Sequence, residues 1–182
     1  MPKWLNLPNF FTLLRVILTP FVIREILEGR HLRALELFAI AAFTDILDGA
    51  AARRFGVVTP TGAYFDPIAD KCLLSGVFLA LAAARIVPRW LVGIIFGRDL
   101  LILGGVGAVL LYTSVRRFPP SGWGKASTFV QILTAVAWMA RDAFEITVLN
   151  AFAALMLWPC VGFTVWSGLD YVRRGIRIAR AH

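Results

Sequence analysis

Long apolar runs separated by short polar breaks are the feature that most restricts how this chain can fold. Of its 182 residues, 59% are hydrophobic and only 16% are charged, which is too little polar surface for a water-soluble domain of this length. A membrane-spanning helix needs about 20 mostly apolar residues, so the chain has room for about six spans joined by short loops. We therefore expect an all-α integral membrane protein with a single domain over residues 1–182.

Charged and loop-forming residues divide the sequence into six predicted transmembrane helices. They cover approximately residues 9–27, 33–53, 62–85, 90–113, 125–140 and 145–169. Six spans place both termini on one side of the membrane. That side carries more Lys and Arg than the other, which favours cytosolic N- and C-termini. The basic segment 171–180 is predicted to lie in the membrane interface as a short amphipathic helix.

The distribution of charge excludes one class of function. The formal net charge of +8 comes from Lys and Arg residues that punctuate the apolar runs. A nucleic-acid-binding protein would gather them on a solvated surface, so we expect membrane anchoring, with anionic phosphate groups as further ligands. Cys72 and Cys160 lie in apolar stretches and are predicted to be buried thiols. Residues 9–27 lack a small-residue cleavage site after them, which favours a retained helix over a signal peptide.

Four aspartates at the adjoining ends of the second and third predicted spans carry the candidate chemistry. Asp45 and Asp48 are three residues apart, and Asp66 and Asp70 are four apart, so each pair shares one helix face. A charged side chain within a spanning helix costs about 2.5–3.5 kcal/mol, and four carboxylates also repel one another. Bound cations compensate both costs, and ligands that are all oxygen favour Mg²⁺ or Mn²⁺ over zinc.

Small residues leave the helix beside these aspartates almost bare. Gly49 and the three alanines that follow it let a neighbouring helix or a phosphate group approach closely, and Arg53 is placed to reach a phosphate. Eight fixed positions over residues 45–70 form the pattern D-x2-D-G-x2-A-R-x8-G-x3-D-x3-D. This pattern resembles that of the CDP-alcohol phosphotransferase family of membrane enzymes. The likeness extends to Asn6, Pro8, Asn9, Thr12 and Arg15, and to residues 97–99, 124–131 and 168–171.

The resemblance implies a fold, a reaction and a role for each matching residue. It implies a homodimer of six-span chains in a bacterial-type inner membrane, with a cytosol-facing site that holds two divalent ions. An acceptor hydroxyl attacks the lipid-side phosphorus of CDP-diacylglycerol, and CMP leaves. Asp45, Asp48 and Asp66 correspond to metal ligands, and Asp70 corresponds to a ligand that is also the general base. The donor pocket corresponds to Asp48, Gly49, Ala52, Arg53 and Gly62.

The acceptor alcohol is left open between two resemblances. The overall pattern is similar to phosphatidylglycerophosphate synthases, whose acceptor is glycerol 3-phosphate, and candidate ligands for its phosphate are Arg98, Lys125, Arg116 and Arg117. Arg98 lies within an apolar span and needs a partner, and Asp99 is expected to face elsewhere by one helical step. The Arg98-Asp99 pair, and Ser127 where many of those synthases carry a lysine, resemble CMP-forming cardiolipin synthases, whose acceptor is phosphatidylglycerol.

A divalent-cation transporter is the alternative from a different class of protein, because intramembrane acids also serve ion transport. Transporters place such sites near the membrane midplane between repeated halves. This sequence shows no internal repeat, and its aspartates lie toward one membrane face, so the enzyme is favoured.

Overall fold

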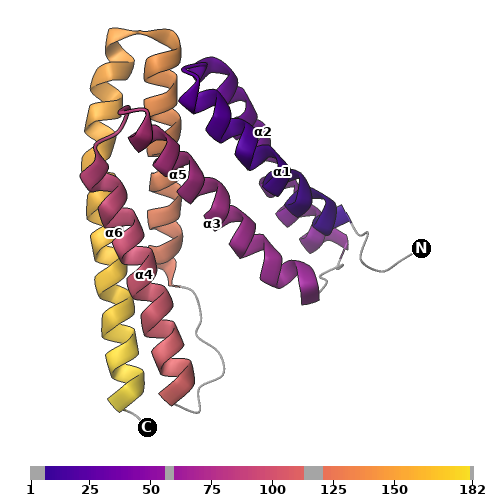
Figure 1. Ribbon diagram of the computed structural model, residues 1–182. Helices are drawn as coiled ribbons and strands as arrows, with labels where there is room; N and C mark the ends of the chain where they lie inside the picture. The colour runs from indigo at the N-terminus through magenta and orange to yellow at the C-terminus, as the bar shows by residue number, and fades with distance from the viewer. Residues whose placement is uncertain (1–6, 56–59, 113–120, 181–182) are drawn as a thin grey trace. The chain divides into compact units, whose positions relative to one another are not determined.

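The computed structural model describes residues 7–55, 60–112 and 121–180, with side chains described for residues 13–44, 69–105 and 121–177. The described residues form six α-helices, one for each predicted span (Figure 1). They are α1 (Leu7–Leu27), α2 (His31–Phe55), α3 (Pro60–Ala83), α4 (Arg89–Tyr112), α5 (Gly122–Phe144) and α6 (Thr147–Arg180). The predicted all-α class is confirmed.

The end of the sixth helix differs from the prediction. Residues 171–180 do not form a separate amphipathic helix but continue α6, which is 34 residues long. No proline interrupts this stretch, and a single glycine such as Gly175 weakens a helix by only about 1 kcal/mol. The ion pair between Arg174 Nε and Asp170 Oδ2, at 2.9 Å and one turn apart, supports the continuous helix.

Length and composition identify α6 as a helix able to cross a bilayer. Over Thr147–Arg177 it is long and apolar enough to span, and it is the only helix in the described part of the chain that meets both conditions. The other five spans, the cytosolic termini and the single domain stay predictions.

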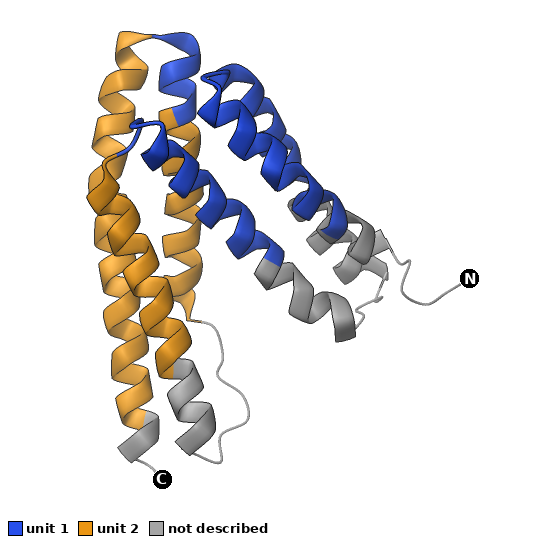
Figure 2. Cartoon of the chain, viewed as in Figure 1, with its two compact units in different colours: residues 1–87, 139–145 blue, residues 88–138, 146–182 orange. Residues whose placement is uncertain are grey.

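The chain divides into two compact units, coloured separately in Figure 2. Unit 1 comprises residues 1–87 and 139–145, and unit 2 comprises residues 88–138 and 146–182. In unit 1, α1 packs against both α2 and α3. Its core is formed by fully buried side chains from all three helices: Val22, Ile26, Phe38, Val77, Phe78 and Leu81. The predicted aspartate positions all belong to this unit.

A tight turn between α1 and α2 folds unit 1 back on itself. Gly29 adopts a φ of 74°, a left-handed conformation that glycine reaches without steric penalty. The Gly29 and Arg30 N–H groups donate to the carbonyls of Ile26 and Glu25, which closes a Schellman motif. Arg30 also forms ion pairs with Glu25 and Glu28. A hydrogen bond from Arg24 lowers the pKa of the Glu28 carboxyl below its usual value.

Close approach of α1 and α3 fixes the alignment of these two helices. A Cβ atom added to Gly76 of α3 would lie 2.8 Å from Ile23 Cδ1 and 3.6 Å from Thr19 Cγ2, both on α1. Thr19 and Ile23 are one turn apart, so they present one face of α1 to α3. Helix α1 therefore rests against bare backbone at this point.

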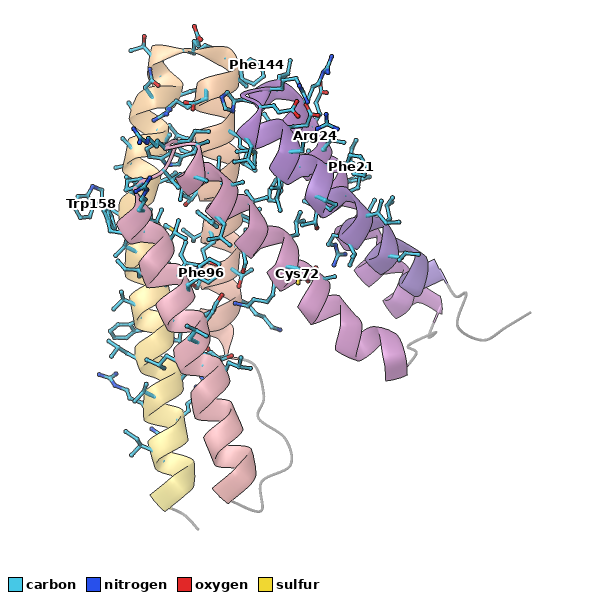
Figure 3. All side chains as sticks on the ribbon, in the orientation of Figure 1. Phe21, Arg24, Cys72, Phe96, Phe144 and Trp158 are labelled. Atoms are coloured by element: carbon cyan, nitrogen blue, oxygen red, sulfur yellow. The ribbon has the colours of Figure 1, made fainter. Side chains whose placement is uncertain are left out.

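The two cysteines do not share the environment predicted for them. Cys160 is buried as predicted, but Cys72 is exposed on α3, where Figure 3 labels it. An apolar stretch predicts an apolar environment, and on a helix of a membrane protein that environment is either protein or lipid. The prediction of a buried Cys72 is wrong because hydropathy does not distinguish the two.

The contact between α1 and α3 generates a prediction about stability. Replacing Gly76 with leucine must displace Ile23 and Thr19, so we expect a loss of about 1–3 kcal/mol. Gly104→Leu is the matched control, because a Cβ there meets nothing within 4 Å. Thermal unfolding of the two variants in detergent measures the difference. Equal losses at both positions would contradict the close packing.

Candidate active site

The four predicted aspartates lie on two consecutive helices, α2 and α3. Asp45 and Asp48 are in the C-terminal half of α2, and Asp66 and Asp70 are in the N-terminal half of α3. Figure 1 shows the C-terminal end of α2 and the N-terminal end of α3 at the same end of unit 1. The helix segments that carry the two pairs therefore lie toward one end of the unit. The side chains outside the described residues are those of Asp45, Asp48, Gly49, Ala52, Arg53, Gly62 and Asp66.

Asp70 is the member of the quartet whose side chain is described. Its carboxylate is partly open, with 45% of the side chain exposed. Arg15 of α1 donates from Nη1 to Asp70 Oδ1, across 55 residues of sequence. The Arg15 side chain is 1% exposed, so the ion pair has one buried partner and one partner that is partly open to solvent.

The sequence places Arg15 within the family likeness but predicts no role for it at the site. A signal for it existed, because an arginine in the middle of an apolar helix needs an acidic partner. The partner could not be identified, since the sequence does not say which helix packs against α1. The contact of α1 with α3 supplies that information.

Arg98 is the centre of polar contacts in unit 2. Its side chain on α4 is nearly buried, with Nη1 donating to Asp99 Oδ1 and Nη2 donating to Ser167 Oγ of α6, both at 2.7 Å. The expectation that Asp99 faces away from Arg98 is wrong, because the long guanidinium side chain reaches the adjacent carboxylate. Arg98 Nε is buried and has no hydrogen-bond partner among the described residues.

Two glycines make room for Arg98 between the helices of unit 2. A Cβ on Gly124 of α5 would lie 3.5 Å from Arg98 Nη2, and one on Gly168 of α6 would lie 3.5 Å from Arg98 Cγ. The same Cβ on Gly124 would lie 3.2 Å from Tyr171 Cε2, which is tighter than ordinary contact. Bare backbone on α5 and α6 thus admits a guanidinium that a larger residue would displace.

The N-terminus of α5 is tied to α6 through Ser121 and Tyr171. Ser121 Oγ accepts a hydrogen bond of 2.9 Å from the Gly124 N–H, which is the arrangement of an N-cap. The Ser121 N–H donates to Tyr171 Oη at 3.1 Å. Lys125 is exposed on the first turn of this fastened helix. The other two predicted acceptor ligands, Arg116 and Arg117, lie outside the described residues.

Ser127, the position at which the two resemblances diverge, lies in the contact between α5 and α6. It is completely buried, and its Oγ is 3.4 Å from Thr164 Oγ1. Gln131 Nε2 donates to the same Thr164 hydroxyl at 3.0 Å. In this chain Ser127 thus contributes to an interhelical hydrogen-bond network.

The donor set of the quartet is suited to a hard divalent cation. Carboxylate oxygens are the ligands that Mg²⁺ and Mn²⁺ prefer, and the partly exposed Asp70 carboxylate is accessible to an ion. Among the side chains that the structure describes, no group of three His, Cys, Asp or Glu residues gathers elsewhere. The candidate site therefore consists of the quartet on α2 and α3, with Arg15 of α1 beside it.

Comparison with known proteins identifies the family to which the chain is similar. A sequence profile described as CDP-alcohol phosphatidyltransferase matches residues 5–166. The chain is 35% identical to the CDP-diacylglycerol–glycerol-3-phosphate 3-phosphatidyltransferase of Bacillus subtilis, over 91% of this chain and 93% of that protein.

Two further relatives represent the two acceptor types. Identity is 34% to a probable phosphatidylglycerophosphate synthase of Mycobacterium tuberculosis, over 94% of this chain and 82% of that protein. It is 31% to a probable CMP-forming cardiolipin synthase of Drosophila melanogaster, over 92% of this chain and 50% of that protein. The profile match covers most of the sequence, including all four aspartates and Arg15, and the chain belongs to the CDP-alcohol phosphatidyltransferase family.

Proposed function

We propose that this protein transfers the phosphatidyl group of CDP-diacylglycerol to glycerol 3-phosphate and releases CMP, which makes it a phosphatidylglycerophosphate synthase. The observation that carries the proposal is the uninterrupted aspartate pattern on two adjoining helix ends, in a chain of this family. Relatives named for this reaction match almost the whole chain at 34–35% identity.

A membrane location suits both the substrate and the surface of the helices. Large apolar side chains are widely exposed, among them Leu103 at 72%, Val148 at 73% and Trp158 at 73%. Trp158 points away from the helices of unit 2 in Figure 3. Exposure on this scale favours lipid contact over water. We propose six membrane spans, cytosolic termini and an active site that faces the cytosol from a bacterial-type inner membrane.

Asp45, Asp48, Asp66 and Asp70 would hold two divalent ions, Mg²⁺ or Mn²⁺. When bound, such ions neutralise the charge on the pyrophosphate and on the leaving phosphate. The donor pocket would be completed by Asp48, Gly49, Ala52, Arg53 and Gly62, with Arg53 contributing a cation for a phosphate oxygen.

Asp70 would act as the general base in a single displacement at phosphorus. The acceptor hydroxyl oxygen forms a bond to the lipid-side phosphorus, the bond from that phosphorus to the CMP oxygen breaks, and the hydroxyl proton moves to Asp70. An ionised, accessible carboxylate is required for this step, and the Asp70 side chain is 45% exposed. No covalent bond to the enzyme is needed, because positioning and charge neutralisation supply most of the catalysis of phosphoryl transfer.

The phosphate of the acceptor would bind at basic residues that the resemblance points to. Lys125 is exposed on the first turn of α5, a helix terminus that also favours anions. Arg98 would contribute less directly, since both Nη atoms already bond to Asp99 and Ser167. Arg116 and Arg117 are the other candidates.

Phosphatidylglycerol is the alternative acceptor, which would make the protein a CMP-forming cardiolipin synthase. The Arg98–Asp99 ion pair and the buried hydroxyl of Ser127 favour it, as does the Drosophila relative. The near-full-length match to bacterial glycerol-3-phosphate enzymes keeps glycerol 3-phosphate ahead. We also propose a homodimer. A divalent-cation transporter is disfavoured by membership of this family of transferases.

Removing a single aspartate tests the reaction. We expect Asp70→Asn to lower kcat at least about a hundredfold while the donor KM changes only a few-fold, because the base acts mainly in the transition state. Asp142→Asn is the control, since Asp142 is not one of the quartet and pairs with Arg141, with 2.5 Å between Asp142 Oδ1 and Arg141 Nε. Release of CMP from CDP-diacylglycerol and glycerol 3-phosphate in Mg²⁺ measures both. Full activity of Asp70→Asn would remove Asp70 from its role as base.

Competition between acceptors decides between the two lipid products. Glycerol 3-phosphate and phosphatidylglycerol, each carrying a different label, are supplied together with CDP-diacylglycerol. We expect the label of glycerol 3-phosphate to appear in phosphatidylglycerophosphate. Lys125→Met should raise the KM for glycerol 3-phosphate about tenfold, which is the loss of one charged contact to phosphate. Accumulation of cardiolipin, with an acceptor KM that Lys125→Met leaves unchanged, would establish the alternative instead.

A further inference from the structure

We propose that Arg15 of α1 is a positioning residue that holds the Asp70 carboxylate in its catalytic orientation. This role rests on the proposed function of Asp70 as general base. It extends the catalytic apparatus from the aspartate-bearing helices α2 and α3 to α1.

The two ends of this ion pair have unequal surroundings. Arg15 is 1% exposed, whereas the Asp70 side chain is 45% exposed. A buried guanidinium is held by the packing around it, and its rigid planar fork restricts the carboxylate that it contacts. An aspartate that loses such a contact can adopt more orientations about its side-chain bonds. The buried arginine therefore orients the aspartate, to which its Nη1 donates at Oδ1.

Helix α1 is itself fixed, so Arg15 has a firm base. Arg15 lies one turn before Thr19, whose hydroxyl donates to the Arg15 carbonyl at 2.8 Å. Thr19 and Ile23 then meet the bare backbone of Gly76 on α3. From Asp70 to Gly76 is six residues, or about 9 Å of helix rise, and from Arg15 to the Thr19–Ile23 turn is about 6–12 Å. Both contacts thus fit one parallel alignment of α1 with α3.

The burial of Arg15 has a cost that stability alone does not explain. Replacing a buried ion pair by apolar residues of similar size is often neutral or stabilising. A buried arginine that pairs with a partly open carboxylate at a proposed active site has a chemical use instead.

Arg15→Met and Arg15→Lys separate positioning from a structural role. We expect Arg15→Met to lower kcat about 10- to 100-fold, with the donor KM within about threefold of the wild type, because misorientation of a catalytic group affects mainly the transition state. Arg15→Lys should recover several-fold of that loss, since it restores the charge without the fork. Arg24→Met is the matched control: Arg24 lies on the same helix, 67% exposed and paired with Glu28.

A thermal cycle tests the pairing without reference to activity. Asp70→Asn removes the carboxylate charge that pairs with the buried Arg15, so we expect a melting temperature lower by about 5 °C or more. In the double variant Arg15→Met/Asp70→Asn, we expect most of the lost melting temperature to be restored. Additive effects of the two substitutions would overturn the pairing.

The outcomes distinguish this inference from the proposed function. An active wild type with an Arg15→Met variant of equal kcat would overturn the inference and leave the function standing. A wild type that releases no CMP with any acceptor would overturn the function, and the thermal cycle would still decide whether Arg15 holds Asp70. A fall in kcat that disappears when the variant is assayed well below its melting temperature would assign Arg15 a structural role only.

Discussion

The ion pair between Arg15 and Asp70 is the interaction on which the proposed orientation of the general base depends. It joins α1 to α3, the helix that follows the aspartate-bearing end of α2. Charged groups are costly within apolar helices, so each needs a partner, a ligand or water. Arg15 meets that need with a carboxylate, and Asp70 meets it with a guanidinium on one side and openness to substrate on the other. The packing of three helices is thereby coupled to the position of the proposed base.

In unit 2, a buried arginine is compensated by a carboxylate and a hydroxyl of the same unit. Arg98 is surrounded by protein, with Asp99 beside it on α4 and Ser167 across on α6. Glycines on α5 and α6 provide the space, and the Ser127–Thr164–Gln131 contacts continue the polar network along the same helices. Such a network aligns the helices because each hydrogen bond fixes a distance between them. Lys125 is then presented from a helix whose start is fastened to Tyr171.

The sequence predicts the helices well and the contacts between them poorly. Apolar runs bounded by charges locate six helices to within a few residues at most ends, and the aspartate spacing identifies the family. The failures have physical causes. Hydropathy does not distinguish a lipid environment from a protein interior, so the sequence predicts a buried Cys72 where the structure has an exposed one. The angle between adjacent residues on a helix does not account for the length of an arginine side chain. The sequence therefore does not predict the ion pair between Arg98 and Asp99. Arg15 and Asp70 are 55 residues apart, and no local pattern connects them.

The central claim is that the carboxylates on α2 and α3 exist in an apolar chain because they hold a pair of divalent ions for a pyrophosphate substrate. Electron paramagnetic resonance of the protein in nanodiscs, titrated with Mn²⁺ in the presence of CDP-diacylglycerol, tests it most directly. We predict two spin-coupled Mn²⁺ ions per chain, as in other two-metal sites with ions about 3.5–4 Å apart, and loss of the coupling in Asp66→Asn. A single isolated Mn²⁺ ion per chain, or none, would contradict the account.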